Sequence, residues 1–467
     1  MEGFRPFHWE EKKQASSGAE YLVRIGDFVL ADENGEPEAT MYSYSYIGLP
    51  EEKEKPVVFA YNGGPGAASS WLHMGILGPK IIEIPGYPEV KRPADFTFGE
   101  NEDFLIDTCD LVLIDPVGTG YTQVIKEGAE DKYYAVGSDG EAFARFIADW
   151  LQKNDRHDAP VYLLGESYGT IRNVVLADLL PESVNLKGII SVGTSLNVGA
   201  RGSLPVEPNV RRLGANAAGC WYHYHQKDYR EEDFIAEAMG FAYGEYAKAL
   251  LMGSRLPKAQ QEEVLDKLAF YSGLEKELLR KQNLRFNEMD FMTRLCPGCF
   301  VSMYDSRMTL PLEDDPASGE KANVDIVLPK EEQEPFMSCI GTSIDRCLEQ
   351  YYDEELERPS GRNYQNETMA IGVGWDYGSY KKDTLALPEE LMREKKGLRF
   401  LFVNGRFDLS STFDFMTYYL SQYDLPKDRI AVKVIESGHA SYIGEGKAKE
   451  LSEAVRAFVE NGEEEIG

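Results

Sequence analysis

The chain has 467 residues, of which 43% are apolar and 12% aromatic, which is enough to bury a large core and excludes wholesale disorder. The 49 basic and 79 acidic residues give a formal net charge of −30. Because so acidic a chain repels phosphate backbones and anionic lipid surfaces, we expect neither nucleic acid nor a membrane as its partner. The oligomeric state stays open, with a homodimer among the alternatives.

The amino terminus and the cysteines together favour a reducing compartment. Residues 1–14 lack the basic start and the apolar run of a secretory signal, and no later segment approaches the about 18 apolar residues of a membrane span. The six cysteines are too sparse for a disulfide framework. We therefore expect a cytoplasmic protein, unless a signal has been removed from the chain as given.

The predicted strands are of two kinds. Residues 21–61 alternate with the period of a strand, with Tyr42, Tyr44 and Tyr46 on one face, which predicts an antiparallel opening. Six short apolar runs bounded by turn residues indicate strands buried on both faces, as in a parallel sheet covered by helices. These runs are residues 56–64, 111–120, 161–166, 186–193, 398–405 and 430–438.

Between residues 200 and 370 a helical pattern replaces the strand pattern. Apolar residues recur every three or four positions from Phe234 to Leu250, and Pro257 begins a second helical run that ends near Gly273. The polar stretch 312–325 is expected to be an exposed loop, and the acidic end a frayed tail. The pattern predicts an α/β core, residues 1–199 and 371–467, with a largely helical cap inserted at 200–370.

The motif G-E-S-Y-G, residues 165–169, lies between a predicted strand and a predicted helix. A G-x-S-x-G match carries weight only in that context, where the two glycines permit a sharp turn that exposes the serine hydroxyl. The helix N-terminus would then point at an oxyanion formed beside the serine. Ser167 is therefore the predicted nucleophile; the alternative is a glycine-rich turn with an incidental serine.

A serine nucleophile needs a histidine to take its proton and a carboxylate to orient that histidine. His439 directly follows the last predicted strand, and Asp408 stands just past the end of another one. Asp414 is the rival acid, but the segment after Asp408 is predicted to be a helix that would carry it away. The order Ser167, Asp408, His439 is that of α/β-hydrolases. The other histidines are His8 in an expected unstructured start, His73 near a glycine-rich loop, His157 in a polar turn, and His223 and His225 in the cap.

Five segments resemble, in the family's own order, the landmarks of the serine carboxypeptidase family. They are YNGGPGAASSWLHMGILGP (61–79), LVLIDPVGTGYT (111–122), GESYG (165–169), NGRFD (404–408) and ESGHASYIGE (436–445). The segments MYDSRMT (303–309) and WDYG (375–378) are more similar to the bacterial branch. The resemblance implies an α/β-hydrolase fold and removal of C-terminal amino acids from peptides with a free C-terminus, through an acyl-enzyme. We expect no cofactor and no metal.

The resemblance also implies roles for the residues around the nucleophile. Gly64 and Tyr168 match the positions whose backbone amides form the family's oxyanion hole. Asn62, Gly63 and Glu166 match those that hold the terminal carboxylate of the substrate. An acid beside the nucleophile suits that task, because two carboxyl groups can share one proton in a short hydrogen bond.

The chain departs from the family pattern at three positions near the site. Ala60 replaces a tryptophan and Ala67 a cysteine that forms a disulfide, the latter in agreement with a reducing compartment. Ile76 stands where the family commonly has a glutamate that pairs with the acid before the serine. Carboxylate binding by Glu166 is therefore a weaker expectation than the triad.

Other arrangements of reactive residues are weighed against this interpretation. Cys296 and Cys299 have the spacing of a redox or zinc half-site, but zinc needs two more ligands, so structural thiols are favoured. His223 and His225 stand two apart, as a strand pair of metal ligands would, but aromatic packing in the cap near the cleft is favoured. An esterase or acyltransferase with the same triad and a catalytically silent binding protein remain as alternatives.

Overall fold

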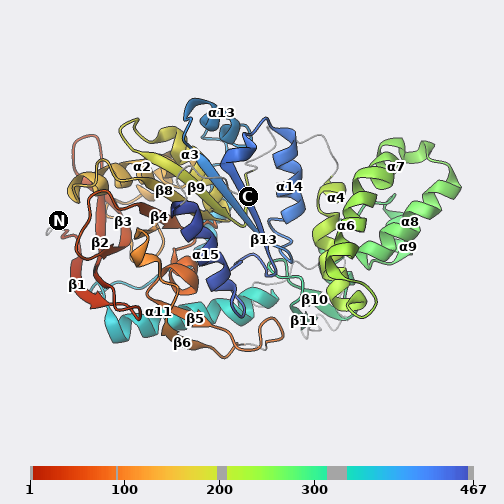
Figure 1. Ribbon diagram of the computed structural model, residues 1–467, viewed down its shortest axis with the longest axis horizontal. Helices are drawn as coiled ribbons and strands as arrows, with labels where there is room; N and C mark the ends of the chain where they lie inside the picture. The colour runs from red at the N-terminus through yellow and green to blue at the C-terminus, as the bar shows by residue number, and fades with distance from the viewer. Residues whose placement is uncertain (1–3, 91–92, 197–207, 313–333, 461–467) are drawn as a thin grey trace.

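The computed structural model describes residues 4–90, 93–196, 208–312 and 334–460 (Figure 1). At its centre lies a nine-stranded sheet with the order β1-β2-β3-β7-β4-β8-β9-β12-β13. Its strands are β1 (His8–Gln14), β2 (Glu20–Ala31), β3 (Pro37–Gly48), β4 (Val57–Tyr61), β7 (Asp110–Asp115), β8 (Val161–Glu166), β9 (Leu186–Val192), β12 (Arg399–Gly405) and β13 (Ile430–Ile435).

The sheet is antiparallel at its beginning and parallel from β7 to β13. β1, β2, β3 and β7 pair antiparallel, whereas β4 pairs parallel with β7 and β8, and β9 pairs parallel with β8 and β12. The six apolar runs are thus the six parallel strands, and the antiparallel opening is also observed. The expectation of an unstructured start at His8 is wrong, because His8 lies in β1 and pairs with Gly26 of β2. The run of charged residues at 10–13 suits such an edge strand, but it has no apolar alternation that would predict a strand from the sequence.

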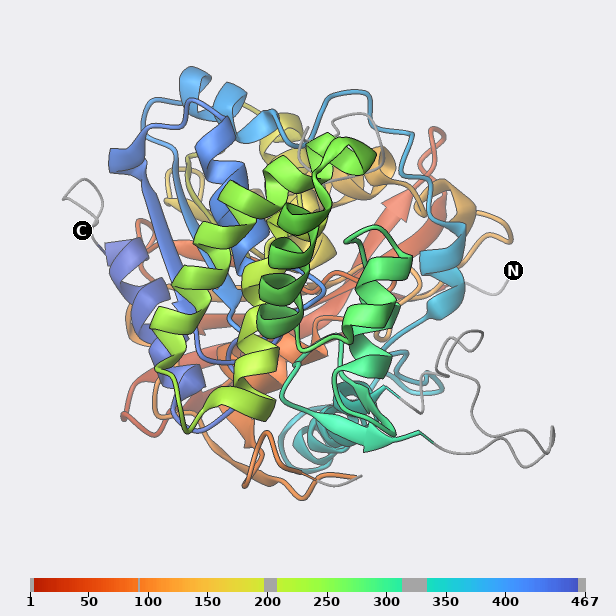
Figure 2. The same ribbon diagram turned by 90° about the vertical axis from the view of Figure 1, so that its right-hand side faces the viewer.

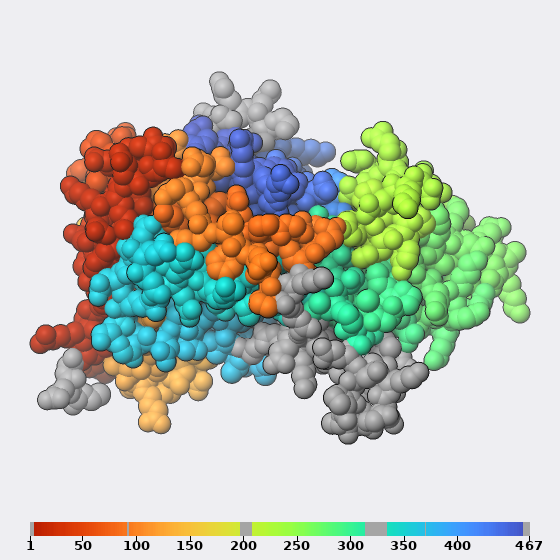
Figure 3. Space-filling model, turned by 90° about the horizontal axis from the view of Figure 1, so that it is seen from below, coloured from red at the N-terminus to blue at the C-terminus, as the bar shows by residue number. Residues whose placement is uncertain are grey.

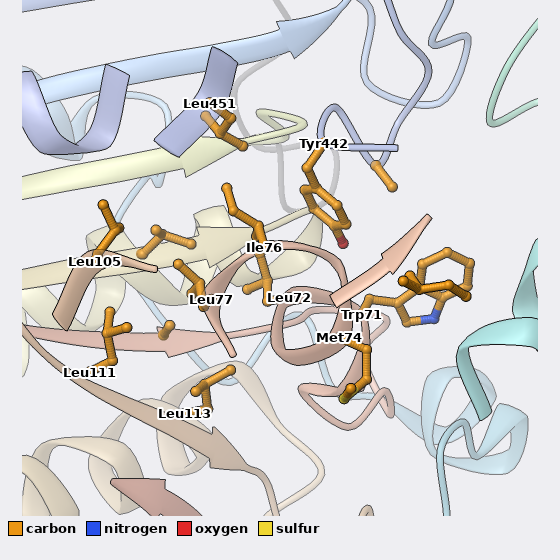
Figure 4. Packing of buried hydrophobic residues seen from close by; sticks show 14 of the residues in the cluster. Trp71, Leu72, Met74, Ile76, Leu77, Leu105, Leu111, Leu113, Tyr442 and Leu451 are labelled. Carbon is orange, nitrogen blue, oxygen red and sulfur yellow. The ribbon is translucent and has the colours of Figure 1, made fainter. Parts of the chain in front are cut away.

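Helices cover both faces of the sheet. α2 (Val136–Lys153), α3 (Tyr168–Leu179), α13 (Leu387–Glu394) and α14 (Phe413–Gln422) bury their apolar side chains in a cluster on one face. On the other face lie α11 (Thr342–Glu355), α15 (Lys447–Glu460) and the short helical segment 70–77. Figure 4 shows this second face, where Leu72, Ile76 and Leu77 pack towards Leu111 and Leu113 of β7.

The segment between β9 and β12 carries the predicted helices. Between residues 208 and 311 it forms α4 (Pro208–Arg211), α5 (Leu213–Cys220), α6 (Glu231–Phe241), α7 (Ala247–Met252), α8 (Lys258–Ser272), α9 (Lys276–Lys281), α10 (Glu288–Arg294) and a two-stranded sheet of β10 (Cys299–Val301) and β11 (Thr309–Pro311). Figure 2 shows these helices in front of one end of the sheet. They share an apolar cluster of their own, which also takes in Phe407, Leu409 and Phe413.

One part of the predicted cap does not belong to that cluster. α11 lies within residues 200–370, yet Ile344, Cys347 and Leu348 join the core cluster on the face of the sheet. Most of the stretch 312–325 and the residues after Glu460 lie outside the described residues, so the expected loop and tail stay predictions. Within the described segments, no helix is long and apolar enough to cross a membrane.

Candidate active site

The predicted nucleophile stands on a sharp turn between a strand and a helix. β8 ends at Glu166, α3 begins at Tyr168, and Ser167 between them has φ 58° and ψ −123°. Such a backbone is strained for a residue with a side chain and is characteristic of a nucleophile elbow. A Cβ at Gly165 would lie 2.1 Å from the carbonyl oxygen of Gly169, so the tight turn requires glycine there.

The predicted base and acid meet in the loops that follow β13 and β12. Nδ1 of His439 donates a hydrogen bond to Oδ2 of Asp408, at 2.8 Å. Oδ1 of Asp408 accepts from the backbone N–H groups of Ser410 and Ser411 at 2.8 and 3.1 Å, so both oxygens of this buried carboxylate are satisfied. Bonding through Nδ1 leaves Nε2 as the proton acceptor of the imidazole.

The pKa of His439 reflects this pairing. Burial alone lowers it, but the charge of Asp408, the hydrogen bond to it and the charge of Glu166 raise the pKa above its ordinary value. The imidazolium is therefore favoured relative to a free histidine. A base of this kind stabilises the cation that forms when it takes a proton from a serine.

The rival acid Asp414 occupies a different place. It lies in the first turn of α14 and accepts hydrogen bonds from the backbone N–H groups of Gly214 and Ala215 at 2.7 and 3.3 Å. Burial raises the pKa of Asp414 to about 6. Its carboxyl group thus joins α14 to the start of α5 rather than orienting a histidine.

A cavity of about 380 Å³ at this edge of the sheet is lined by Ser167 and His439, with Gly63 and Gly64 on one side. A Cβ at Gly63 would lie 2.5 Å from the backbone nitrogen of Tyr168, so only glycine lets the two segments approach so closely. Tyr168 begins α3, and its N–H belongs to the first turn, which has no acceptor inside the helix. The two predicted oxyanion-hole segments thus adjoin the serine.

Glu166 is buried beside the serine and also lines the cavity. Its Oε2 accepts two hydrogen bonds, from Nδ2 of Asn62 at 2.7 Å and from the hydroxyl of Tyr442 at 2.8 Å. Burial raises the pKa of Glu166 to about 7, although His439, Tyr442 and Asn62 each favour the ionised form. This carboxyl group can therefore hold or release a proton near neutrality.

Tyr442 is a site residue that the sequence interpretation missed. Its hydroxyl bonds to Glu166, and its ring lies beside Ile76 in the same buried cluster (Figure 4). A Cβ at Gly75 would lie 2.2 Å from that ring, so the glycine makes room for it. The only signal in the sequence was a tyrosine three residues after His439, which reads as a core aromatic.

Comparisons with known proteins agree with this geometry. Residues 26–191 match the family model described as serine carboxypeptidase. This part of the chain is therefore similar to the serine carboxypeptidase family. Serine carboxypeptidase-like 36 of Arabidopsis thaliana is 26% identical over 172 residues, which are 34% of this chain and 32% of that protein. Serine carboxypeptidase-like 31 of the same plant is 26% identical over 179 residues, 35% of this chain and 34% of its own. The matches thus span about a third of the length of these relatives.

A solved structure extends the likeness of fold to the whole chain. Kex1(delta)p, a prohormone-processing carboxypeptidase from Saccharomyces cerevisiae, superposes with a TM-score of 0.56 at 14% identity and covers 95% of this chain and 91% of its own. The mostly parallel sheet, flanked by helices and carrying a serine elbow, is an α/β-hydrolase fold.

Behind the cavity, a network of buried polar groups fixes the loop that carries Asn62. Oδ1 of Asn62 accepts from the N–H of Leu72 at 3.0 Å, and its backbone carbonyl accepts from Nη1 of Arg172 at 2.7 Å. Arg172 is paired in turn with Asp139 at 2.7 Å. Asp115 accepts from the N–H of Ser69 in the same loop, also at 2.7 Å. The resemblance to family motifs pointed to Asn62, but nothing in the sequence indicated that Arg172 and Asp139 hold its loop in place.

Much of the rest of the cavity wall comes from segments between β9 and β12. The lining residues in these segments are Tyr304, Phe336, Met337, Glu367, Thr368, Gly372, Val373 and Tyr377. Phe336 stacks on Trp71, with ring centres 5.5 Å apart. Among the described lining residues none belongs to helices α5–α9. The part of the insertion that shapes the cavity is therefore the part from Tyr304 onwards.

The histidine pair and the cysteine pair of the insertion were weighed above as metal or redox sites. Residues 221–225 form a π-helical turn rather than a strand, in which His225 stacks on Phe234 with ring centres 4.9 Å apart. Cys296 and Cys299 are both free thiols, and burial raises the pKa of Cys296 to about 11. Among the residues that the structure describes, no three His, Cys, Asp or Glu side chains form a group able to hold a metal ion.

Proposed function

We propose that this hydrolase is a serine-type carboxypeptidase, which removes single amino acids from peptides with a free C-terminus. One observation carries the proposal: Glu166, a buried acid with a pKa near 7, lines the same cavity as Ser167 and His439. An esterase has no need of a second carboxyl group beside its nucleophile. A peptidase that recognises a terminal carboxylate needs one that can supply a proton.

In the proposed reaction, Ser167 attacks the carbonyl carbon of the last peptide bond while His439 takes the hydroxyl proton. Asp408 holds the imidazole in orientation and stabilises its positive charge. The backbone N–H groups of Gly64 and Tyr168 donate to the oxyanion of the tetrahedral intermediate. His439 then gives its proton to the leaving amine, the free amino acid departs, and water repeats the sequence on the acyl-enzyme.

The terminal carboxylate of the peptide is bound by Asn62, the N–H of Gly63 and Glu166 in this proposal. Two ionised carboxylates at hydrogen-bond distance repel each other, so the complex holds one proton between them. With a pKa near 7, Glu166 is protonated in much of the free enzyme below that pH. Tyr442 and Asn62 bond to one oxygen of Glu166, which orients the carboxyl group.

The test compares a blocked peptide acid with its C-terminal amide and with a small neutral ester. We expect hydrolysis of the acid at a kcat/KM about 10²-fold above that of the amide, since the amide offers no carboxylate to Asn62 and Glu166. Labelling of Ser167 by a fluorophosphonate reports the triad independently. Equal turnover of acid and amide, with the ester the best substrate, would replace the proposal with an esterase.

The cytoplasm is the location that we propose for this activity. All six cysteines are free in the structure, and four of them are buried. A protein matured in an oxidising compartment would more commonly pair its cysteines. Fractionation of the source cells, with an antibody to the chain, is the corresponding measurement.

A further inference from the structure

A second cavity, of about 600 Å³, adjoins the one that holds Ser167. Met337 and Glu367 line both cavities and form their common wall. Among the described residues that line the second cavity there is no member of the proposed triad or carboxylate site. Its volume is within the range of small-molecule sites, so it can hold a part of a peptide that the reacting groups do not touch.

The common wall is fixed to the loop that carries Gly63 and Gly64. Residues 365–368 run alongside that loop as a short strap of extended chain. Its backbone hydrogen bonds join Gly120 to Gln365 in both directions at 2.7 and 2.9 Å, Ala68 to Asn366 at 2.8 Å, and Thr368 to Gly66 at 2.8 Å. A group bound in the second cavity is therefore held at a fixed place relative to the proposed oxyanion hole.

The lining of the second cavity combines carboxylates with aromatic rings. Asp345 and Glu349 lie one helical turn apart on α11, and Glu367 lies on the strap. The rings are those of Tyr121, Tyr352 and Tyr364. Carboxylates attract a cation by charge, and the faces of tyrosine rings attract it through their quadrupole, so both kinds of group favour the same ligand.

Neither Asp345 nor Glu349 forms an ion pair within the described part of the chain; Asp345 accepts a hydrogen bond from the amide of Asn366. The guanidinium of Arg358 lies 5.6 Å from the centre of the Tyr352 ring, donates a hydrogen bond to the backbone carbonyl of Glu349 at 2.8 Å, and is paired with Asp353 at 2.7 Å. Figure 3 shows the face on which the cyan segment that contains α11 lies beside the orange segment that contains residues 80–90.

We propose that the second cavity is a subsite for a positively charged group on the amino-terminal side of the scissile bond. This inference rests on the proposed carboxypeptidase function, in which Asn62 and Glu166 fix the last residue in the first cavity. A group that reaches past Met337 and Glu367 then belongs to a residue further upstream. It is either a lysine or arginine side chain or the α-amino group of a short peptide.

The experiment uses tetrapeptides with a free C-terminus and a blocked amino group, carrying either lysine or acetyl-lysine at each position in turn. A neutral tetrapeptide with a free or an acetylated amino group forms the second arm. We expect kcat/KM to be about ten-fold higher for the charged member of a pair, either at one upstream position or at the α-amino group. The arm that responds identifies the source of the charge.

Two variants of α11 connect that preference with the cavity. Glu349→Gln removes a lining charge and should lower the ratio between charged and neutral peptides at least about three-fold. Glu354→Gln removes the same charge from the same helix, at an exposed residue outside the cavity whose described partner is Gln350, and should leave the ratio unchanged. A ratio that moves equally in both variants would reflect the general charge of the protein and would overturn the subsite.

Other outcomes also decide the matter. Cleavage without a charge preference at any upstream position, or with a preference confined to the C-terminal residue, overturns the subsite but leaves the proposed function intact. If no peptide is cleaved, the proposed function fails. The subsite is then tested by calorimetry, which measures the Kd of the same peptides for the Ser167→Ala protein. A ten-fold difference in Kd within a pair, lost in Glu349→Gln, supports the subsite; equal affinities or no binding rejects it.

Discussion

The chemistry and the walls of this site come from two different kinds of structure. Ser167 and Asp408 follow the buried parallel strands β8 and β12, and His439 follows the half-exposed edge strand β13, so the hydrogen-bonded sheet fixes their relative positions. Most of the walls come from Tyr304, Phe336 and residues 367–377, which lie in loops and short helices between β9 and β12. Reacting groups on a rigid scaffold and selecting groups on variable segments are a common division of labour. The comparison therefore predicts that changes at the sheet edge alter the rate, and changes in the insertion alter the choice of substrate.

The largest expected effect comes from the sheet edge. Ser167→Ala and His439→Ala should each lower kcat about 10⁶-fold for every substrate, because nucleophile and base act as a unit. The double variant should be scarcely worse than either single one. Measurements of kcat on a peptide and on a neutral ester, with circular dichroism to verify the fold, check this. A loss of activity towards only one class of substrate would contradict this division, because Ser167 would then help to select the substrate rather than act on every substrate.

The acid provides the next test, with a matched control in the same segment. Asp408→Asn should lower kcat about 10⁴-fold, since the amide can no longer stabilise the imidazolium or select its tautomer. Asp414→Asn should leave kcat within about three-fold and act on stability instead, because Asp414 bonds to the start of α5. Thermal unfolding and initial rates of both variants separate the two roles. An active Asp408→Asn enzyme beside an inactive Asp414→Asn enzyme would reverse the assignment.

The same division explains what could be predicted from the sequence. The parallel strands are short apolar runs, and Ser167, Asp408 and His439, the proposed triad, follow three of them, so pattern and motif could single them out. The strap 365–368, the second cavity and Arg172 depend on contacts between residues more than 100 positions apart, for which no local pattern exists. Tyr442 was missed because a buried tyrosine reads as core, and α11 was assigned to the cap because a helical pattern does not reveal which cluster it joins.

Glu166 tests whether the sheet edge also recognises the substrate. In the wild type, KM for a peptide acid should rise as pH increases through about 7, because Glu166 then loses the proton that it shares with the peptide carboxylate. Glu166→Gln should flatten this trend, since an amide donates a hydrogen bond without a titrating proton. The change in KM should be about ten-fold between pH 6 and 8. If the dependence of KM on pH is unchanged in Glu166→Gln, we would infer that residues of the insertion bind the peptide carboxylate and that the sheet edge takes part in catalysis only.

The smallest expected effect concerns Tyr442, which donates to the same oxygen of Glu166 as Asn62 does. The bond favours the ionised carboxylate, so Tyr442→Phe should raise the pKa of Glu166 above about 7. A group whose pKa is raised keeps its proton to higher pH, so the rise in KM for a peptide acid should begin about one pH unit later. The ring still fills its place over Gly75, so the fold should be retained. The kcat for a neutral ester, which depends on His439, should change less than about two-fold and serves as the control. A rise in KM that begins at lower pH than in the wild type would mean that the hydroxyl stabilises the protonated acid, and the proton shared with the peptide would then have to come from elsewhere.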